Sequence, residues 1–219
     1  MKLDVQEALR YLGAGDGAPE ALRGEVEAVA GALAAELQPR YTFRVFDLER
    51  AGAGILLSGT GMALTGNTAE RMLAQCARAA LLACTLGARF DALLRREQAR
   101  DMARAVILDA CGSALVESGC DAAERDIAAR FPDLYLTDRF SPGYGDLPLA
   151  LQPPICAALD TPRRLGVHVT ESLLMNPGKS VTAVVGLSDR PQMARVRGCA
   201  YCSMRESCTL RKGGRHCGI

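Results

Sequence analysis

The motif Arg-Phe-Ser-Pro-Gly-Tyr, residues 139–144, brings together side chains that suit recognition of a small charged ligand. Arg139 offers a planar fork of N–H donors that matches a carboxylate, and Tyr144 offers an aromatic face and a hydroxyl. Between them, Pro142 stiffens the chain, and Gly143 can adopt a positive φ or let a ligand approach the backbone closely. The motif predicts either a binding turn for a ligand with a carboxylate and an aromatic base, or a surface turn with a solvated arginine.

Four cysteines near the C-terminus follow the pattern Cys-x2-Cys-x5-Cys-x8-Cys, namely Cys199, Cys202, Cys208 and Cys217. Thiolates can bind zinc in a closed tetrahedral site or hold an iron–sulfur cluster, and such spacings occur for both. Unreactive cysteines are the third interpretation. The remaining five cysteines lie among apolar residues and are expected in the core: Cys76, Cys84, Cys111, Cys120 and Cys156.

The composition is that of an ordinary globular protein. The 219 residues are 49% hydrophobic and 23% charged, which suits one domain, or one domain with a small appendage. The net charge of +1 gives no reason to expect a nucleic-acid or membrane partner. The first residues carry charges where a signal peptide needs an apolar core, and no apolar run approaches about 18 residues, so the protein is expected in the cytoplasm.

Positive charge is concentrated at the C-terminus. Residues 190–219 contain seven lysines and arginines against Glu206 alone. We therefore expect a body, residues 1–189, followed by a basic cysteine-rich tail, residues 190–219, which either docks electrostatically or is simply solvated.

Helices and strands are mixed along the body, which favours an α+β fold with an antiparallel or mixed sheet flanked by helices. The expected helices cover residues 5–12, 19–37, 67–76, 89–119, 121–131 and 149–159, and a break is expected near residues 98–101 in the fourth. The expected strands cover residues 41–48, 54–58, 78–84, 134–138, 167–172 and 180–187. Asn67 or Thr68 is expected to cap the third helix, and Asp121 the fifth.

Two motifs, in this order, resemble the signatures of a known family. Residues 139–144 fit the R-x-x-x-G-Y pattern of the S-adenosylmethionine-binding activation (reactivation) domain of cobalamin-dependent methionine synthase. Residues 170–181, with Thr-Glu-Ser, then Met, Pro-Gly and Ser-Val, resemble that domain's second signature, T-E-S-x-x-M-x-P-x-x-S-V. The resemblance covers residues 62–188 and is strongest in the last third of that range.

This resemblance implies that Arg139, Pro142, Gly143 and Tyr144 hold S-adenosylmethionine, with Arg139 at its carboxylate. Because the sulfonium already activates the methyl group, the protein needs to position the ligand rather than supply an acid or a base. Glu171 is expected either to line the ligand cleft or interact with the ligand's positive charge, or to pair with an arginine as a strand-edge carboxylate.

Two further positions bear on the ligand. Glu117 lies on the helix from which the family directs a carboxylate to the ligand, and Ser113 is the alternative residue for that position. The family's ligand-contacting tyrosine after the second signature has no counterpart, because the sequence at 184–188 is Val-Val-Gly-Leu-Ser.

The resemblance implies a stand-alone reactivation factor that binds S-adenosylmethionine for reductive methylation of cob(II)alamin. Cobalamin is expected on a partner, methionine synthase or a related corrinoid protein, because the Asp-x-His-x-x-Gly motif of a cobalamin module is absent. Cobalt(II) needs one electron before methylation, which favours an iron–sulfur cluster over zinc in the tail. Such a factor is an accessory domain of a methyltransferase rather than a self-sufficient enzyme. The alternatives are a non-catalytic corrinoid-protein adaptor with a structural zinc knuckle, or an iron–sulfur electron-transfer protein.

Overall fold

The structure is a computed structural model that describes residues 3–52, 54–192 and 206. The chain forms two compact units, each assembled from segments that are far apart in the sequence. The first unit consists of Met1–Thr42, Cys84–Ala123 and Thr161–Val181. The second unit consists of Phe43–Ala83, Glu124–Asp160 and Thr182–Ile219.

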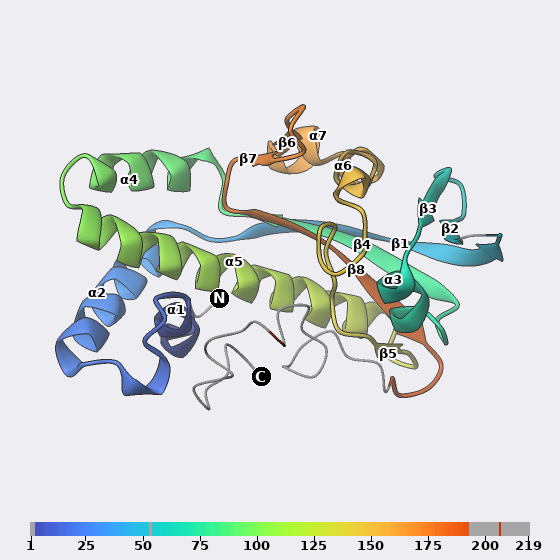
Figure 1. The fold of residues 1–219 in the computed structure, drawn as a ribbon, viewed down its shortest axis with the longest axis horizontal. Helices are drawn as coiled ribbons and strands as arrows, with labels where there is room; N and C mark the ends of the chain where they lie inside the picture. Colours follow the sequence, from blue (N-terminus) through green and yellow to red (C-terminus); the bar gives the residue numbers. More distant parts are fainter. Residues whose placement is uncertain (1–2, 53, 193–205, 207–219) are drawn as a thin grey trace. The chain divides into compact units, whose positions relative to one another are not determined.

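The first unit is built mainly from helices (Figure 1). They are α1 (Val5–Tyr11), α2 (Glu20–Glu36), α4 (Ala88–Gln98), most of α5 (Met102–Arg130) and α7 (Thr161–Leu165), with a 3-10 turn at Gly15–Gly17 and a hairpin of β6 (His168–Val169) and β7 (Met175–Asn176). α1 begins where it does because the Asp4 carboxylate accepts the N–H groups of Gln6 and Glu7 at 2.8 and 3.3 Å. No helix among the described residues is both long enough and apolar enough to span a membrane.

A six-stranded sheet makes up most of the second unit, in the order β3-β2-β1-β4-β8-β5 (Figure 1). The strands are β1 (Arg40–Ala51), β2 (Gly54–Leu57), β3 (Met62–Leu64), β4 (Arg78–Thr85), β5 (Tyr135–Leu136) and β8 (Ser180–Ser188). β2 pairs antiparallel with β1 and β3, and β5 pairs antiparallel with β8. The other elements are α3 (Asn67–Met72), α6 (Gln152–Leu159), a 3-10 turn at Leu149–Leu151 and the end of α5.

The predicted α+β class is confirmed, and the three strand pairs just named are antiparallel, in agreement with the predicted antiparallel or mixed sheet flanked by helices. β4 and β8 are buried along nearly their whole length, which explains why they read as continuous apolar runs rather than as alternating patterns. The strand predicted at 167–172 is reduced to the two residues of β6. The pattern does not predict β3, because three residues are too short to show an alternation.

The predicted break near residues 98–101 is confirmed, because α4 ends at Gln98 and α5 begins at Met102. The predicted break after residue 119 is wrong, because α5 continues to Arg130. Gly119 lies inside this helix, where glycine is ordinarily unfavourable. A Cβ at this position would lie 2.5 Å from Pro39 Cβ and 2.6 Å from Cys84 Sγ. Gly119 therefore permits close packing rather than ending a helix. Asp121 lies within α5 and does not cap a helix.

The five cysteines of the described body are buried, as predicted: Cys76, Cys84, Cys111, Cys120 and Cys156. Burial raises the pKa of the Cys76 and Cys111 thiols to about 11. Both thiols are therefore protonated at neutral pH, as expected for packing residues rather than nucleophiles or metal ligands.

Candidate ligand-binding turn

Arg139 is held by a carboxylate from the last turns of α5. Its Nη1 donates to Glu124 Oε1 at 2.7 Å, and only 8% of the Arg139 side chain and 27% of the Glu124 side chain are exposed. The next residue, Phe140, is buried and exchanges two backbone hydrogen bonds of 3.0 and 2.8 Å with Val184 of β8. Arg139 is therefore a largely buried cation fixed beside an acid, not a solvated surface arginine.

The turn that follows is closed by its own backbone. The N–H of Gly143 donates to the Leu147 carbonyl at 2.9 Å, and that of Tyr144 donates to the Ser141 carbonyl at 3.0 Å. Gly143 has a φ of +84°, so the expectation that this turn needs a glycine is confirmed. Pro142 is buried, whereas 42% of Tyr144 is exposed. The turn thus presents an aromatic ring a few residues after the buried guanidinium.

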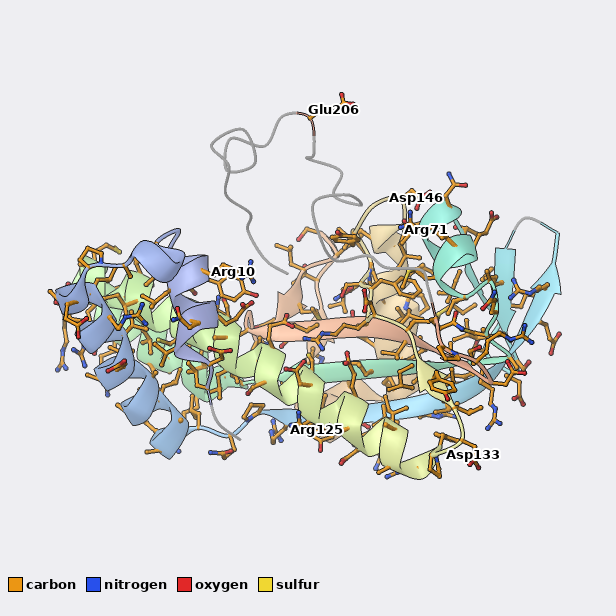
Figure 2. All side chains as sticks on the ribbon, turned by 90° about the horizontal axis from the view of Figure 1, so that it is seen from below. Arg10, Arg71, Arg125, Asp133, Asp146 and Glu206 are labelled. Atoms are coloured by element: carbon orange, nitrogen blue, oxygen red, sulfur yellow. The ribbon has the colours of Figure 1, made fainter. Side chains whose placement is uncertain are left out.

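Asp146 fastens the same turn to helix α3 (Figure 2). Its Oδ2 accepts the N–H of Asn67 at 2.6 Å, and its Oδ1 accepts the N–H of Thr68 at 2.9 Å. A hydrogen bond from the Thr68 hydroxyl, followed by those two N–H groups, lowers the pKa of Asp146. The predicted cap at Asn67 or Thr68 is wrong, because the N-cap position is Gly66 and the capping carboxylate comes from Asp146.

The sequence patterns miss two residues that hold this turn, Glu124 of α5 and Asp146. Glu124 lies seven positions after Glu117 on one helix, so both occupy the same helical face, and the expected break after residue 119 hid that relation. Asp146 carries no local signal, because its partners lie 79 and 78 positions away.

The two glutamates predicted to approach the ligand belong to the first unit, whereas residues 139–144 belong to the second. Glu117 is half-buried on α5, and its charge adds to burial in raising the pKa of the Tyr11 phenol. Glu171 is exposed in the turn between β6 and β7. The structure brings Arg139, Pro142, Gly143 and Tyr144 into one turn, and the roles of Glu117 and Glu171 stay predictions.

The second signature folds as the β6–β7 hairpin and the start of β8. The Thr170 hydroxyl lies 2.9 Å from Ser172 Oγ and accepts the N–H of Leu174 at 3.1 Å, which closes the hairpin turn. Ser180 Oγ donates to the Pro177 carbonyl at 2.7 Å and lies within hydrogen-bonding distance of Thr85 Oγ1, at 2.8 Å. The polar residues of this signature therefore have structural partners within the first unit.

A surface pocket of about 280 Å³ also lies in the first unit, between α1, α4 and α5. Its walls are largely apolar and include Tyr11 and Val106, while Asp109 and Ser113 are polar lining residues. Lys179 Nζ donates to Asp109 Oδ2 and to Ser113 Oγ, both at 2.9 Å. Ser113, the alternative to Glu117, therefore accepts a hydrogen bond from Lys179, whose positive charge is paired with the Asp109 carboxylate.

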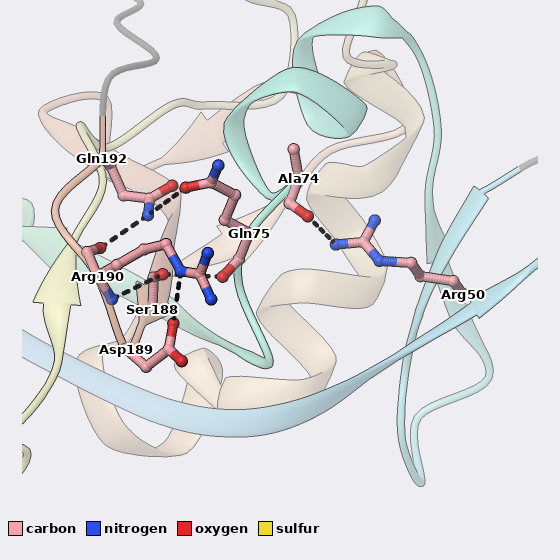
Figure 3. A network of polar contacts seen from close by, with 7 residues as sticks. All are labelled: Arg50, Ala74, Gln75, Ser188, Asp189, Arg190 and Gln192. Carbon is pink, nitrogen blue, oxygen red and sulfur yellow. Dashed lines mark hydrogen bonds and ion pairs between the residues drawn. The ribbon is translucent and has the colours of Figure 1, made fainter.

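The predicted metal ligands Cys199, Cys202, Cys208 and Cys217 lie outside the described residues. Within the described ranges, no three histidine, cysteine, aspartate or glutamate side chains are grouped so as to hold a metal ion. The described body ends at Gln192, whose Nε2 donates to the Arg190 carbonyl at 2.9 Å (Figure 3). The metal site of the tail remains a prediction.

Comparison with known proteins identifies a structural relative. No family model and no curated protein matches the chain. A solved structure described as "Crystal Structure of the MetH Reactivation Domain bound to AdoHcy" matches with a TM-score of 0.67 and 18% sequence identity, over 99% of this chain and 82% of that one. The chain therefore has the fold of the MetH reactivation domain.

Proposed function

We propose that this protein binds S-adenosylmethionine at the turn around Arg139–Tyr144 and takes part in reductive reactivation of a cobalamin-dependent methyltransferase of the methionine synthase type. The observation that carries the proposal is the R-x-x-x-G-Y motif, folded as a turn beside a guanidinium–carboxylate pair. Its support is the likeness in fold to a reactivation domain crystallised with AdoHcy, a compound related to S-adenosylmethionine.

The charges beside the turn match the amino-acid end of this ligand. The guanidinium of Arg139 suits its carboxylate, and the carboxylate of Glu124 suits its ammonium group. In this proposal the ligand carboxylate pairs with Arg139 and the ligand ammonium group pairs with Glu124. Each side chain therefore keeps an opposite charge beside it when the ion pair opens. The exposed ring of Tyr144 offers a surface for the adenine.

Residues of the turn bind and orient, and the ligand supplies the reactive group. The ligand would supply the methyl group from its sulfonium, and the partner's corrinoid, once reduced by one electron, would accept it, so that the methylated corrinoid and AdoHcy would be the products. The protein needs only to hold the sulfonium in line with the metal, since no proton is transferred. The corrinoid belongs to the partner in this proposal.

The proposal extends to the tail, where Cys199, Cys202, Cys208 and Cys217 would bind an iron–sulfur cluster that delivers this electron. Zinc bound by the same thiolates would instead make the tail a structural knuckle. Anaerobic purification with visible absorption and analysis of iron, sulfide and zinc separates the two. A colourless protein with one zinc would overturn the redox role and favour the adaptor.

Isothermal titration with S-adenosylmethionine and with methylthioadenosine, which lacks the amino-acid end, tests the site. The wild type should prefer S-adenosylmethionine, and Arg139→Ala should lose that preference by about tenfold to hundredfold, the worth of charged hydrogen bonds. Arg139→Lys keeps the charge but not the fork and should fall between. Arg125→Ala, at an exposed arginine of α5 next to Glu124 (Figure 2), is the matched control.

The folded state of each variant is checked by circular dichroism before titration. A wild type that binds neither compound would overturn the proposed function. Equal affinities of the wild type and Arg139→Ala for S-adenosylmethionine would overturn the assignment of the site.

A further inference from the structure

The candidate turn is tied to helix α3 by a residue outside the R-x-x-x-G-Y motif. The Asp146 carboxylate accepts the first two N–H groups of α3, from Asn67 and Thr68. We propose that Asp146 is a positioning residue for ligand binding, which holds the backbone of 143–147 in the conformation that presents Tyr144. This inference rests on the proposed function, because it concerns the same ligand turn.

The contact between the turn and α3 is made at backbone distance, and a glycine stands on each side of it. A Cβ on Gly66 would lie 2.8 Å from the Asp146 carbonyl oxygen, and one on Gly145 would lie 2.6 Å from Thr68 Oγ1. Their φ angles of +98° and +59° are also conformations that side-chain-bearing residues rarely adopt. Neither position tolerates a side chain, so the close approach is a specific feature of this fold.

Two anchors therefore bracket the part of the turn that carries Gly143 and Tyr144. On one side, Phe140, the second residue of the motif, is bonded to Val184 of β8 through both backbone groups. On the other side, Asp146, which follows the motif, is bonded to α3. The segment between them holds Gly143 and Tyr144, and its closure depends on the bond from the Gly143 N–H to Leu147, the residue after Asp146. Loss of the second anchor should free the side of the turn that carries Tyr144.

Helix α3 can serve as a support because its other end is also fixed. Arg50 Nη2 donates to the carbonyls of Leu73 and Ala74, at 2.7 and 2.8 Å. Ser188 Oγ donates to the Gln75 carbonyl at 2.8 Å (Figure 3). The segment that follows α3 is thus tied to β1 and to the end of β8, so the sheet defines where Asp146 finds its N–H partners.

Amide hydrogen exchange in the absence of ligand tests the positioning role. Asp146→Ala removes the acceptors of Asn67 and Thr68, so their exchange should accelerate in any case. The informative amide is that of Gly143, whose N–H donates to the Leu147 carbonyl and not to the Asp146 carboxylate, and which should exchange about tenfold faster if the turn is released. Unchanged exchange of Gly143 would show that Asp146 only caps a helix and would overturn the inference.

Titration with S-adenosylmethionine completes the test. Asp146→Ala should weaken binding about tenfold, and Asp146→Asn, which keeps one acceptor oxygen, should weaken it less. Asp4→Ala is the matched control, because Asp4 caps α1 in the first unit through two N–H groups in the same way. Equal weakening by Asp4→Ala and Asp146→Ala would mean a global loss of stability and would overturn the inference.

A pair of glycine variants probes the contact from its other side. Gly145→Ala places a Cβ against Thr68, whereas Gly59→Ala, at a similar φ of +76°, meets nothing within 4 Å. Only Gly145→Ala should accelerate exchange of Gly143 and weaken binding, and equal effects of the two variants would contradict the positioning role.

The two proposals fail in different ways. If the wild type does not bind S-adenosylmethionine but Gly143 exchanges faster in Asp146→Ala, the proposed function is rejected. The result would still show that Asp146 holds the backbone of the turn. If the wild type binds S-adenosylmethionine and Asp146→Ala binds it equally tightly, the positioning role is rejected and the proposed function stands.

Discussion

Arg139 and Glu124 would face opposite demands from stability and from the proposed ligand binding. Removing one partner of a buried ion pair typically costs about 3–5 kcal/mol, whereas replacing both partners with apolar residues of similar size is often neutral. The Glu124 side chain is 27% exposed, so the loss should lie at or below the lower end of that range. A ligand that supplies its own charges would relieve the same penalty that a substitution creates.

A double-mutant cycle separates the two demands. Glu124→Leu should lower the free energy of unfolding by about 2–3 kcal/mol, because it leaves the Arg139 guanidinium without this carboxylate. Adding Arg139→Met should restore part of that loss while leaving the protein unable to bind S-adenosylmethionine. Urea unfolding of the four proteins measures the coupling. Strictly additive losses would show that the two side chains do not depend on each other.

The contact between the Asp146 carboxylate and the N–H groups of Asn67 and Thr68, here called the Asp146 clamp, should weaken as pH falls. Hydrogen bonds from Thr68 and Asn67 lower the pKa of Asp146 in the folded protein. The carboxylate therefore contributes stability above its unfolded-state pKa, and this contribution is lost as pH falls through the lowered folded value. An NMR titration should give the Asp146 carboxyl a midpoint below the ordinary value of about 3.9. The Thr68 amide should titrate with it, and should cease to do so in Asp146→Asn; a midpoint at or above 3.9 would contradict the clamp.

At the scale of elements, α5 depends on a glycine that a helix ordinarily avoids. A methyl group on Gly119 would collide with Pro39 and Cys84, both of which are in close contact with this turn of the helix. Gly31 of α2 is the natural comparison, since it is exposed, also lies inside a helix, and has nothing within 4 Å of a Cβ.

Alanine substitutions at these two glycines should act in opposite directions. Gly31→Ala should stabilise the protein by about 0.4–1 kcal/mol, because it lowers the backbone entropy of the unfolded chain. Gly119→Ala should destabilise it by about 1–3 kcal/mol, because the added methyl group overpacks the site. Thermal unfolding measures both, and stabilisation by Gly119→Ala would show that the helix can move away from Pro39.

The same elements show how far the sequence leads. Local patterns suffice for α1, α2 and β1, because their apolar spacing follows from which face each one buries, and for β8, because its burial on both faces gives a continuous apolar run. They fail at Gly119, where a glycine is needed because Pro39 and Cys84, which are distant in sequence, leave no room for a Cβ. They also fail at Asp146, which caps a helix that begins 79 positions earlier. The motif locates the turn, but its supports are long-range contacts that no window along the sequence contains.

At the scale of the molecule, the two signatures fall in different units. Residues 139–144 belong to the second unit and residues 170–181 to the first. Residues of the second signature stabilise the first unit, since Thr170 and Ser180 form hydrogen bonds within that unit. Direct ligand contacts are therefore best sought first at the turn of the second unit, where the charged pair and the exposed ring occur together.

The end of β8 sets the boundary at which a truncated body should remain stable. Ser188 is buried, pairs with Tyr135 of β5 and donates to the Gln75 carbonyl. A chain ending at Gln192 keeps these bonds, whereas a chain ending at Leu187 loses them. The shorter chain should unfold with about 2 kcal/mol less free energy than the 1–192 chain, from lost hydrogen bonds and an exposed sheet edge.

Comparison of the full chain with the 1–192 chain then assigns the metal and the ligand to separate parts. The 1–192 chain should bind S-adenosylmethionine as tightly as the full chain, because Arg139, Glu124 and Asp146 are all retained. It should contain no iron or zinc, because the four tail cysteines are removed. Metal analysis and titration of the same two preparations decide both points. Metal retained by the 1–192 chain would contradict the tail as the metal site, and lost affinity would mean that the ligand site needs residues beyond Gln192.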